Sequence, residues 1–224
     1  MGFSLKGKPV AASYDPPKES ASPPEHFLDF DEVMQLVEKL DVKQIRFEGM
    51  EPTIDPQYLQ ITKALHDRFG TRNMVATNLF ELPSFEHTDM IVVGINAITD
   101  SLHKEYTGRS NKQILENFIE VYKSGKKMEV TSPFIPGYID IEETERIAKF
   151  VASVDANIPY FIFPYYKAGD NPWRRPTHNE IDQVAAIVKK HLTNVYHYYG
   201  DEELDFKVEP IFPALEDIIK TVER

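Results

Sequence analysis

Met90-Ile91-Val92-Val93-Gly94-Ile95 is the stretch that decides the fold class. Its residues are apolar almost without interruption, as expected for a strand that is covered on both faces. Other short β-rich runs occur along the chain, and amphipathic segments of helical length separate most of them. Alternation of this kind implies parallel strands joined by right-handed crossover connections. The sequence therefore predicts an α/β fold.

The alternation favours one architecture, a partial (β/α)6 TIM-like barrel with parallel strands in a single domain. The predicted strands are 44–48, 74–77, 90–95, 128–135, 160–164 and 194–199. The predicted helices are one that begins at Asp29 and then 55–69, 98–106, 110–124, 140–154, 177–191 and 213–223. A doubly wound open sheet has the same alternation, but no Gly-x-Gly-x-x-Gly follows the first strand to support it.

The chain divides into a core and two flanking segments. Residues 15–29 hold four of the 16 prolines and read as a loop without regular structure. We therefore predict a proline-rich N-terminal loop region over residues 1–30, a barrel core over 31–200 and a C-terminal helical extension over 201–224.

The composition limits the classes of partner. With 25 Lys and Arg against 36 Asp and Glu, the formal net charge is −11. This balance argues against nucleic acid or an anionic membrane surface and favours a small-molecule ligand or a protein partner. No apolar run approaches the ~20 residues of a membrane span, so a cytoplasmic location is expected by default.

In a βα barrel the chemistry lies at the carboxyl ends of the strands. Gly49-Met50-Glu51-Pro52 follows the first predicted strand, and its glycine and proline predict a tight bend that presents Glu51 and main-chain carbonyls to the mouth. Such a setting suits an ammonium group. The alternative is an ordinary βα loop that leads into the next helix. The later strands end at Asn78, Asn96, Ser132 and Tyr166.

A second group of side chains follows the fifth strand. Tyr165-Tyr166-Lys167 ends that strand, and Trp173-Arg174-Arg175 follows within ten residues. Gathered at one point, these rings and cations would suit an anionic or aromatic ligand. A solvated loop is the alternative.

Several segments taken together resemble the radical SAM superfamily, and within it the pyruvate formate-lyase-activating enzymes and their archaeal-type relatives. The similarity runs from about residue 31 to residue 200, and the segments are Glu48-Gly49-Met50-Glu51-Pro52-Thr53, Ala76-Thr77-Asn78, residues 98–111, Ile114-Leu115-Glu116-Asn117 and Phe134-Ile135-Pro136-Gly137-Tyr138. The resemblance implies a partial barrel in which a Gly-Gly-Glu-Pro motif holds the amino group of S-adenosylmethionine. The implied ligand-binding residues are Gly49, Met50, Glu51, Pro52, Asn78, Asn96, Ser132 and Tyr166.

Three positions depart from the pattern of this family. Met50 replaces the second glycine of the motif, and Leu79 replaces the glycine of a Thr-Asn-Gly motif. The family's Asp-x-Lys-type strand end, near the ribose of the ligand, falls at Gly94-Ile95-Asn96, so its charges are absent. S-adenosylmethionine remains a possible ligand.

The largest departure concerns the [4Fe–4S] cluster, which the family holds through Cys-x3-Cys-x2-Cys before the first helix. This chain has no cysteine. If Tyr14 matches the aromatic residue that precedes the third cysteine, the three ligand positions fall on Lys8, Ala12 and Asp15. Their side chains cannot supply soft thiolate ligands to iron, so no cluster is expected.

These observations favour a radical-SAM-like barrel without a competent cluster site, which binds S-adenosylmethionine or a related nucleotide-like ligand weakly or serves as a non-catalytic partner. Two alternatives stay open. The chain is the cysteine-replaced form of an active activating-type enzyme, or it is a cluster-independent barrel enzyme that uses Glu51. None of the seven histidines forms a His-x3-His pair, so no metal site is predicted.

Overall fold

A curved sheet of six parallel strands organises the structure, a computed structural model that describes residues 2–3, 9–10, 27–49, 51–166 and 171–202. The strand order is β3-β4-β5-β6-β7-β8, so each strand pairs with its neighbours in the sequence. The bounds are β3 Gln44–Phe47, β4 Arg72–Thr77, β5 Met90–Gly94, β6 Lys127–Phe134, β7 Tyr160–Pro164 and β8 Val195–His197. Two short strands, β1 Gly2–Phe3 and β2 Pro9–Val10, form a separate antiparallel pair.

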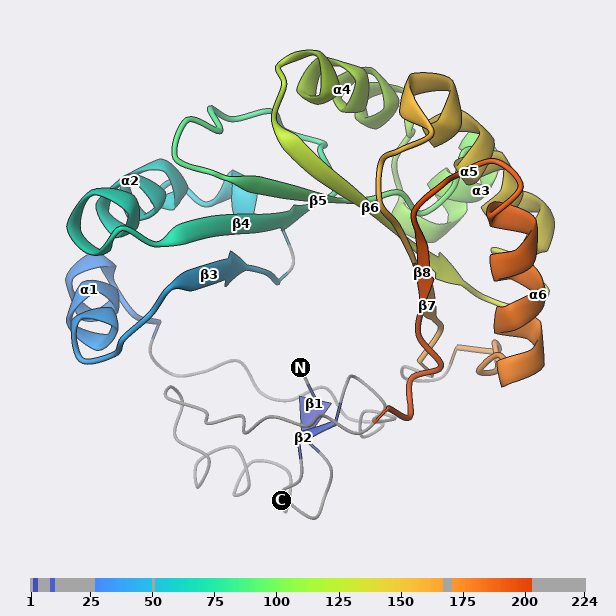
Figure 1. Cartoon of the computed structure of the whole chain (residues 1–224), viewed down its shortest axis with the longest axis horizontal. Coiled ribbons are helices and arrows are strands. Elements are labelled where there is room, and N and C mark those ends of the chain that lie inside the picture. Colours follow the sequence, from blue (N-terminus) through green and yellow to red (C-terminus); the bar gives the residue numbers. More distant parts are fainter. Residues whose placement is uncertain (1, 4–8, 11–26, 50, 167–170, 203–224) are drawn as a thin grey trace.

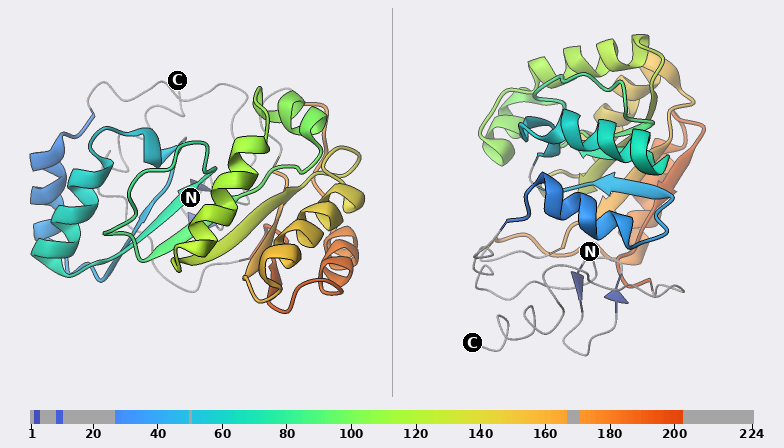
Figure 2. Two further views of the ribbon diagram at one scale, coloured as in Figure 1. Left: turned by 90° about the horizontal axis from the view of Figure 1, so that it is seen from above. Right: turned by 90° about the vertical axis from the view of Figure 1, so that its left-hand side faces the viewer.

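The helices cover the outer, convex face of this sheet (Figure 1, Figure 2). They are α1 Phe30–Glu38, α2 Tyr58–Phe69, α3 Asp100–Thr107, α4 Lys112–Lys123, α5 Ile141–Asp155 and α6 His178–Val188, with a 3-10 turn, η1, at Pro52–Ile54. The predicted partial barrel is thereby confirmed. The doubly wound alternative is wrong, because such a sheet reverses its strand order and carries helices on both faces. The predicted helix 213–223 lies outside the described residues.

The core lies between the sheet and the helices. Alternate residues of β6 turn toward the helices, so that Met128, Val130 and Phe134 are buried whereas Thr131 is only half-buried. They join one cluster with fully buried side chains of the helices, such as Phe118 on α4. A smaller cluster around Met34 and Leu65 packs α1 and α2 against β3. This one-sided burial leaves the concave face of the sheet available for a site.

Capping residues in the sequence determine where two of the helices begin. The Asp29 carboxylate accepts the Glu32 amide at 2.9 Å while the Glu32 carboxylate accepts the Asp29 amide at 2.9 Å, which is a complete capping box at the start of α1. Thr177 and Glu180 form the same arrangement at the start of α6. Asp29 therefore caps α1, at the residue where the sequence predicts the helix to begin.

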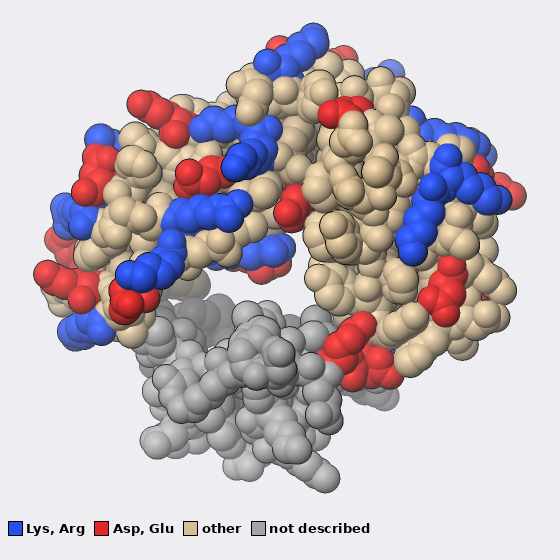
Figure 3. All heavy atoms as spheres, viewed as in Figure 1, with Lys and Arg blue, Asp and Glu red and all other residues tan. Residues whose placement is uncertain are grey.

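The described residues contain no helix that is both long and apolar enough to cross a membrane. On the face viewed in Figure 3, their Lys and Arg side chains are interspersed with Asp and Glu. The expectation that the chain does not bind nucleic acid stays a prediction.

A buried carboxylate holds the loop that follows β5. Glu143, in the first turn of α5, is 6% exposed. It accepts hydrogen bonds from the amides of Ile98 and Thr99 at 2.6 and 2.7 Å, and from the Thr99 hydroxyl at 2.6 Å. Because Asn96 lies just before these amides, Glu143 also fixes one wall of the strand-end region.

We expect Glu143→Ala to lower the free energy of unfolding by about 3 kcal/mol, because it leaves two amides without their charged acceptor. Urea denaturation followed by circular dichroism measures the loss. The matched control is Glu142→Ala, one residue away and exposed, which should cost less than about 1 kcal/mol. Equal effects of the two changes would contradict the assigned role of Glu143.

Candidate functional site

The carboxyl ends of the strands surround a cavity of about 340 Å³ on the concave face. One side of its wall comes from β3, β4 and the loops after them, and the other side comes from β5, β6, β7 and α3. The lining residues are Arg46, Glu48, Gly49, Glu51, Ala76, Thr77, Asn78, Val92, Gly94, Asn96, Tyr106, Thr131, Ser132, Pro133 and Phe163. These residues come together because the carboxyl ends of parallel strands all lie at one edge of the sheet.

Glu51 is the best-fixed charged group of this cavity. Its Oε1 atom accepts the Thr53 amide at 3.2 Å and the Thr53 hydroxyl at 2.6 Å, and its Oε2 atom accepts the Asn78 amide at 2.8 Å. A carboxylate offers about four lone-pair sites, so one site on Oε2 remains. Among the described residues, no lysine or arginine forms an ion pair with Glu51, whereas neighbouring Glu48 pairs with Arg46 at 3.3 Å.

The turns beside Glu51 require unusual backbone conformations. Gly49 has φ +148°, a region that side chains disfavour. Leu79 has φ +58°, in the left-handed region, although it carries a side chain. This is the position where the family resemblance expects glycine. The left-handed conformation costs a residue with a Cβ roughly 1–2 kcal/mol, and the complete burial of Leu79 offsets that cost.

A second cavity of about 390 Å³ adjoins the first and shares Glu51, Asn78 and Asn96 with it. Arg109 lines this cavity and places its guanidinium 4.8 Å above the ring of Phe80. Buried His103 also lines it, and its Nδ1–H donates to the Arg109 carbonyl at 2.7 Å. Since a carbonyl oxygen can only accept, the Nδ1 atom of His103 carries a proton.

Six of the eight predicted ligand-binding residues lie at or beside the first cavity, and their role in binding stays a prediction. Gly49, Glu51, Asn78 and Asn96 line the first cavity, and Pro52 begins η1 directly behind Glu51. Ser132 lines the cavity too, but its hydroxyl is bonded to that of Tyr160 at 2.6 Å in the core. Met50 lies outside the described residues.

Tyr166 does not line either cavity. Its ring lies under the Arg175 guanidinium, 5.3 Å from it. The aromatic and cationic group predicted after the fifth strand is divided: Trp173 stacks on Tyr138 at 4.3 Å, and Arg174 is paired with Glu180. Lys167 lies outside the described residues. Trp173 also contacts Tyr165, at 5.8 Å between ring centroids, so the described side chains lie in two groups, one around Trp173 and one of Tyr166 with Arg175.

Sequence reasoning missed Tyr106, Phe80 and Arg109 as lining residues. Arg109 belongs to the segment 98–111 that carries the family resemblance, so its motif context was a usable signal. Tyr106 faces the cavity from α3, and burial raises the pKa of its hydroxyl, which keeps it protonated at neutral pH. Phe80 carries no signal apart from its position two residues after Asn78.

The [4Fe–4S] cluster that the family resemblance implies does not fit this chain. Lys8, Ala12 and Asp15 lie outside the described residues, but the donor set is decided by the sequence, which contains no cysteine. An ammonium, a methyl group and one carboxylate do not replace three thiolates. No chemistry is therefore derived from a cysteine-ligated [4Fe–4S] cluster.

A partial (β/α)6 barrel with a fixed glutamate at its mouth defines the class of this protein, and comparison with known proteins supplies the family. Residues 12–151 match the family model of the radical SAM superfamily. A provisionally named glycyl-radical enzyme activating enzyme of Methanocaldococcus jannaschii is 30% identical over 183 residues, which cover 78% of this chain and 69% of that protein. The chain belongs to the radical SAM superfamily.

Two further relatives agree with this assignment. The pyruvate formate-lyase-activating enzyme of Staphylococcus aureus is 27% identical over 115 residues, which cover 50% of this chain and 46% of the enzyme. The crystal structure of a domain of pyruvate-formate lyase-activating enzyme from Bacteroides vulgatus is similar with a TM-score of 0.59 at 18% identity, covering 70% of this chain and 99% of that domain. This chain thus spans less than half of the staphylococcal enzyme. The predicted likeness to activating enzymes is confirmed.

We expect the purified chain to stay colourless and free of iron after anaerobic reconstitution with iron and sulfide, because it offers no thiolate. Iron and sulfide analysis together with the absorption spectrum measures this. Bacterially produced activating enzyme, treated in parallel, is the positive control. About four irons per chain with a charge-transfer band near 400 nm would contradict the prediction.

Proposed function

We propose that this chain is a non-redox member of the radical SAM superfamily that binds S-adenosylmethionine, or a related nucleotide-like ligand with a free amino group, weakly at the strand ends. One observation carries the proposal. Glu51 is held in place by three hydrogen-bond donors, retains one acceptor site, and has no cationic partner among the described residues. Such a carboxylate is suited to an ammonium group.

The cavities beside Glu51 favour a ligand with an ammonium at one end and an uncharged body. Asn96 stands where the family resemblance places charges near the ribose, so the ligand's hydroxyls would meet an amide instead. Val92 and Phe163 add apolar surface within the same cavity. Together, the two cavities offer room for the separate amino-acid and nucleoside parts of one ligand.

The absence of the cluster limits the affinity. In the family an iron chelates the amino-acid end of the ligand, and this chain has only the Glu51 contact for that end. One charge-assisted hydrogen bond contributes about 1.5–3 kcal/mol. We therefore expect a binding free energy of roughly −5 to −6 kcal/mol at best, which corresponds to high-micromolar affinity.

Calorimetric titration of S-adenosylmethionine and S-adenosylhomocysteine into wild type and Glu51→Gln tests the proposal. Both ligands carry the amino group, so both should bind wild type, and Glu51→Gln should weaken each about tenfold because the charge of the acceptor is lost. Adenosine lacks the ammonium and should show no difference between the two proteins.

The matched control is Glu48→Gln, which removes a charge from the same cavity wall but from a carboxylate already paired with Arg46. Its ligand affinity should stay within about twofold of wild type, because a partly exposed ion pair has little effect. If wild type shows neither heat nor a thermal shift at millimolar ligand, or if Glu51→Gln binds as well as wild type, ligand binding at Glu51 is refuted. A role as a non-catalytic protein partner would then replace it.

A further inference from the structure

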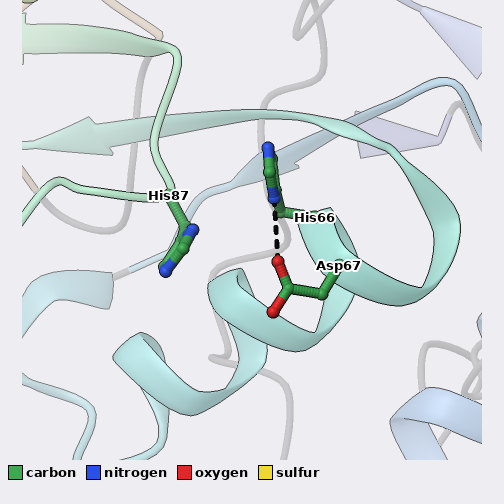
Figure 4. Close-up of side chains that lie close together, drawn as sticks. All are labelled: His66, Asp67 and His87. Carbon is green, nitrogen blue, oxygen red and sulfur yellow. Dashed lines mark hydrogen bonds and ion pairs between the residues drawn. The ribbon is translucent and has the colours of Figure 1, made fainter.

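Three side chains with metal-binding atoms lie close together (Figure 4). They lie at the foot of the sheet, by which we mean the amino ends of its strands, opposite to the cavities at the carboxyl ends. His66 and Asp67 belong to the last turn of α2, and His87 belongs to the loop between β4 and β5. One nitrogen or oxygen atom from each lies within 4.8 Å of the others. We propose that His66, Asp67 and His87 form a binding site for a divalent transition-metal ion, for which Zn²⁺ is the best match.

Two of the three ligand atoms are already close to the required spacing. His66 Nδ1 and Asp67 Oδ1 are 3.0 Å apart. Ligands at 2.0–2.1 Å from a tetrahedral zinc ion stand about 3.3 Å from one another. The ion therefore replaces the present hydrogen bond between these atoms after a small rotation of the two side chains, and the ring of His87 has to approach by at most about 1.5 Å.

The second oxygen of Asp67 is used separately. Lys63, one turn earlier on α2, forms an ion pair with Asp67 Oδ2. The lysine thus orients the carboxylate while Oδ1 continues to face His66. A metal-binding carboxylate commonly has such an outer partner, which fixes its orientation.

The backbones that carry the ligands are held together by one buried side chain. Asn73, at the start of β4, is fully buried and donates from Nδ2 to the carbonyl of Thr62 on α2 and to that of His87, each at 2.8 Å. The next residue, Thr88, is bonded through its hydroxyl to that of Tyr58 at 2.8 Å. The helix and the loop are therefore fixed relative to each other before any ion binds, which lowers the cost of assembling the site.

The ligand set selects the kind of ion. Two imidazoles and one carboxylate match zinc, copper and nickel, whereas magnesium and calcium require more oxygen ligands. The side chains of His66 and Asp67 are 52% and 44% exposed, so an ion can enter from solvent and a water molecule can complete the coordination. The site lies far from Glu51 in the barrel architecture and does not depend on the proposed ligand.

Metal binding is tested with the full chain, produced without a histidine tag and stripped with a chelator. Titration with ZnCl₂ should show about one ion per chain, and His66→Ala and His87→Ala should each weaken the affinity at least tenfold. Zinc at ten times its dissociation constant should raise the melting temperature of wild type by about 3 °C, but not that of the variants. MgCl₂ should have no effect.

The control variant is His178→Ala, which removes another exposed histidine that also lies beside an aspartate, Asp201. It should bind zinc as wild type does. Circular dichroism confirms that each variant is folded, as expected because His66 and His178 are exposed and His87 is only half-buried. Zinc binding that is absent in wild type, or that survives His87→Ala unchanged, overturns the proposal, and equal weakening by His178→Ala shows non-specific binding to surface histidines and overturns it as well.

Discussion

The hydrogen bond from the Asn78 amide to Glu51 Oε2 joins the ends of two neighbouring strands, and the site at the barrel mouth depends on it. Parallel strands pair along their length, but the loops that follow them diverge unless something connects them. Here the connection is a carboxylate that also binds Thr53 at the start of η1. Because the same carboxylate borders both cavities, the group that would contact a ligand is also the group that shapes the loops.

Most of the fold could be predicted because its determinants are local or follow from topology. The apolar run 90–95 and the caps at Asp29 and Thr177 act within a few residues of the elements that they define. Each strand of the six-stranded sheet begins and ends within two residues of its prediction, whereas β1 and β2 were not predicted. Parallel pairing then follows from the alternation, and the absence of Gly-x-Gly-x-x-Gly after the first strand favoured the sequential order over a doubly wound one. By contrast, the hydrogen bonds from Ile98 and Thr99 to Glu143 join residues more than 40 positions apart in the chain, and no local sequence pattern predicts them.

The site was predicted less completely, for reasons of side-chain direction and distance in sequence. Strand periodicity places Ser132 at the right strand end, but its hydroxyl turns toward the helices and bonds Tyr160. Proximity in sequence suggested that Tyr166 and Trp173 act together, yet each found a different partner. Leu79 shows the opposite case: a leucine adopts the backbone conformation expected of glycine, because burial of its side chain compensates for the strain.

The two ends of the barrel have different chemical requirements, and this explains how the chain can lack the cluster ligands and still keep a defined structure. A cluster site needs several soft thiolates from one loop, so the absence of cysteine removes that chemistry entirely. At the foot, the buried side-chain amide of Asn73 connects α2 to the loop that carries His87. The metal site proposed there needs only nitrogen and oxygen ligands. Since the two ends share no side chains among these contacts, binding at one should leave binding at the other unchanged, as is usual for sites without common partners.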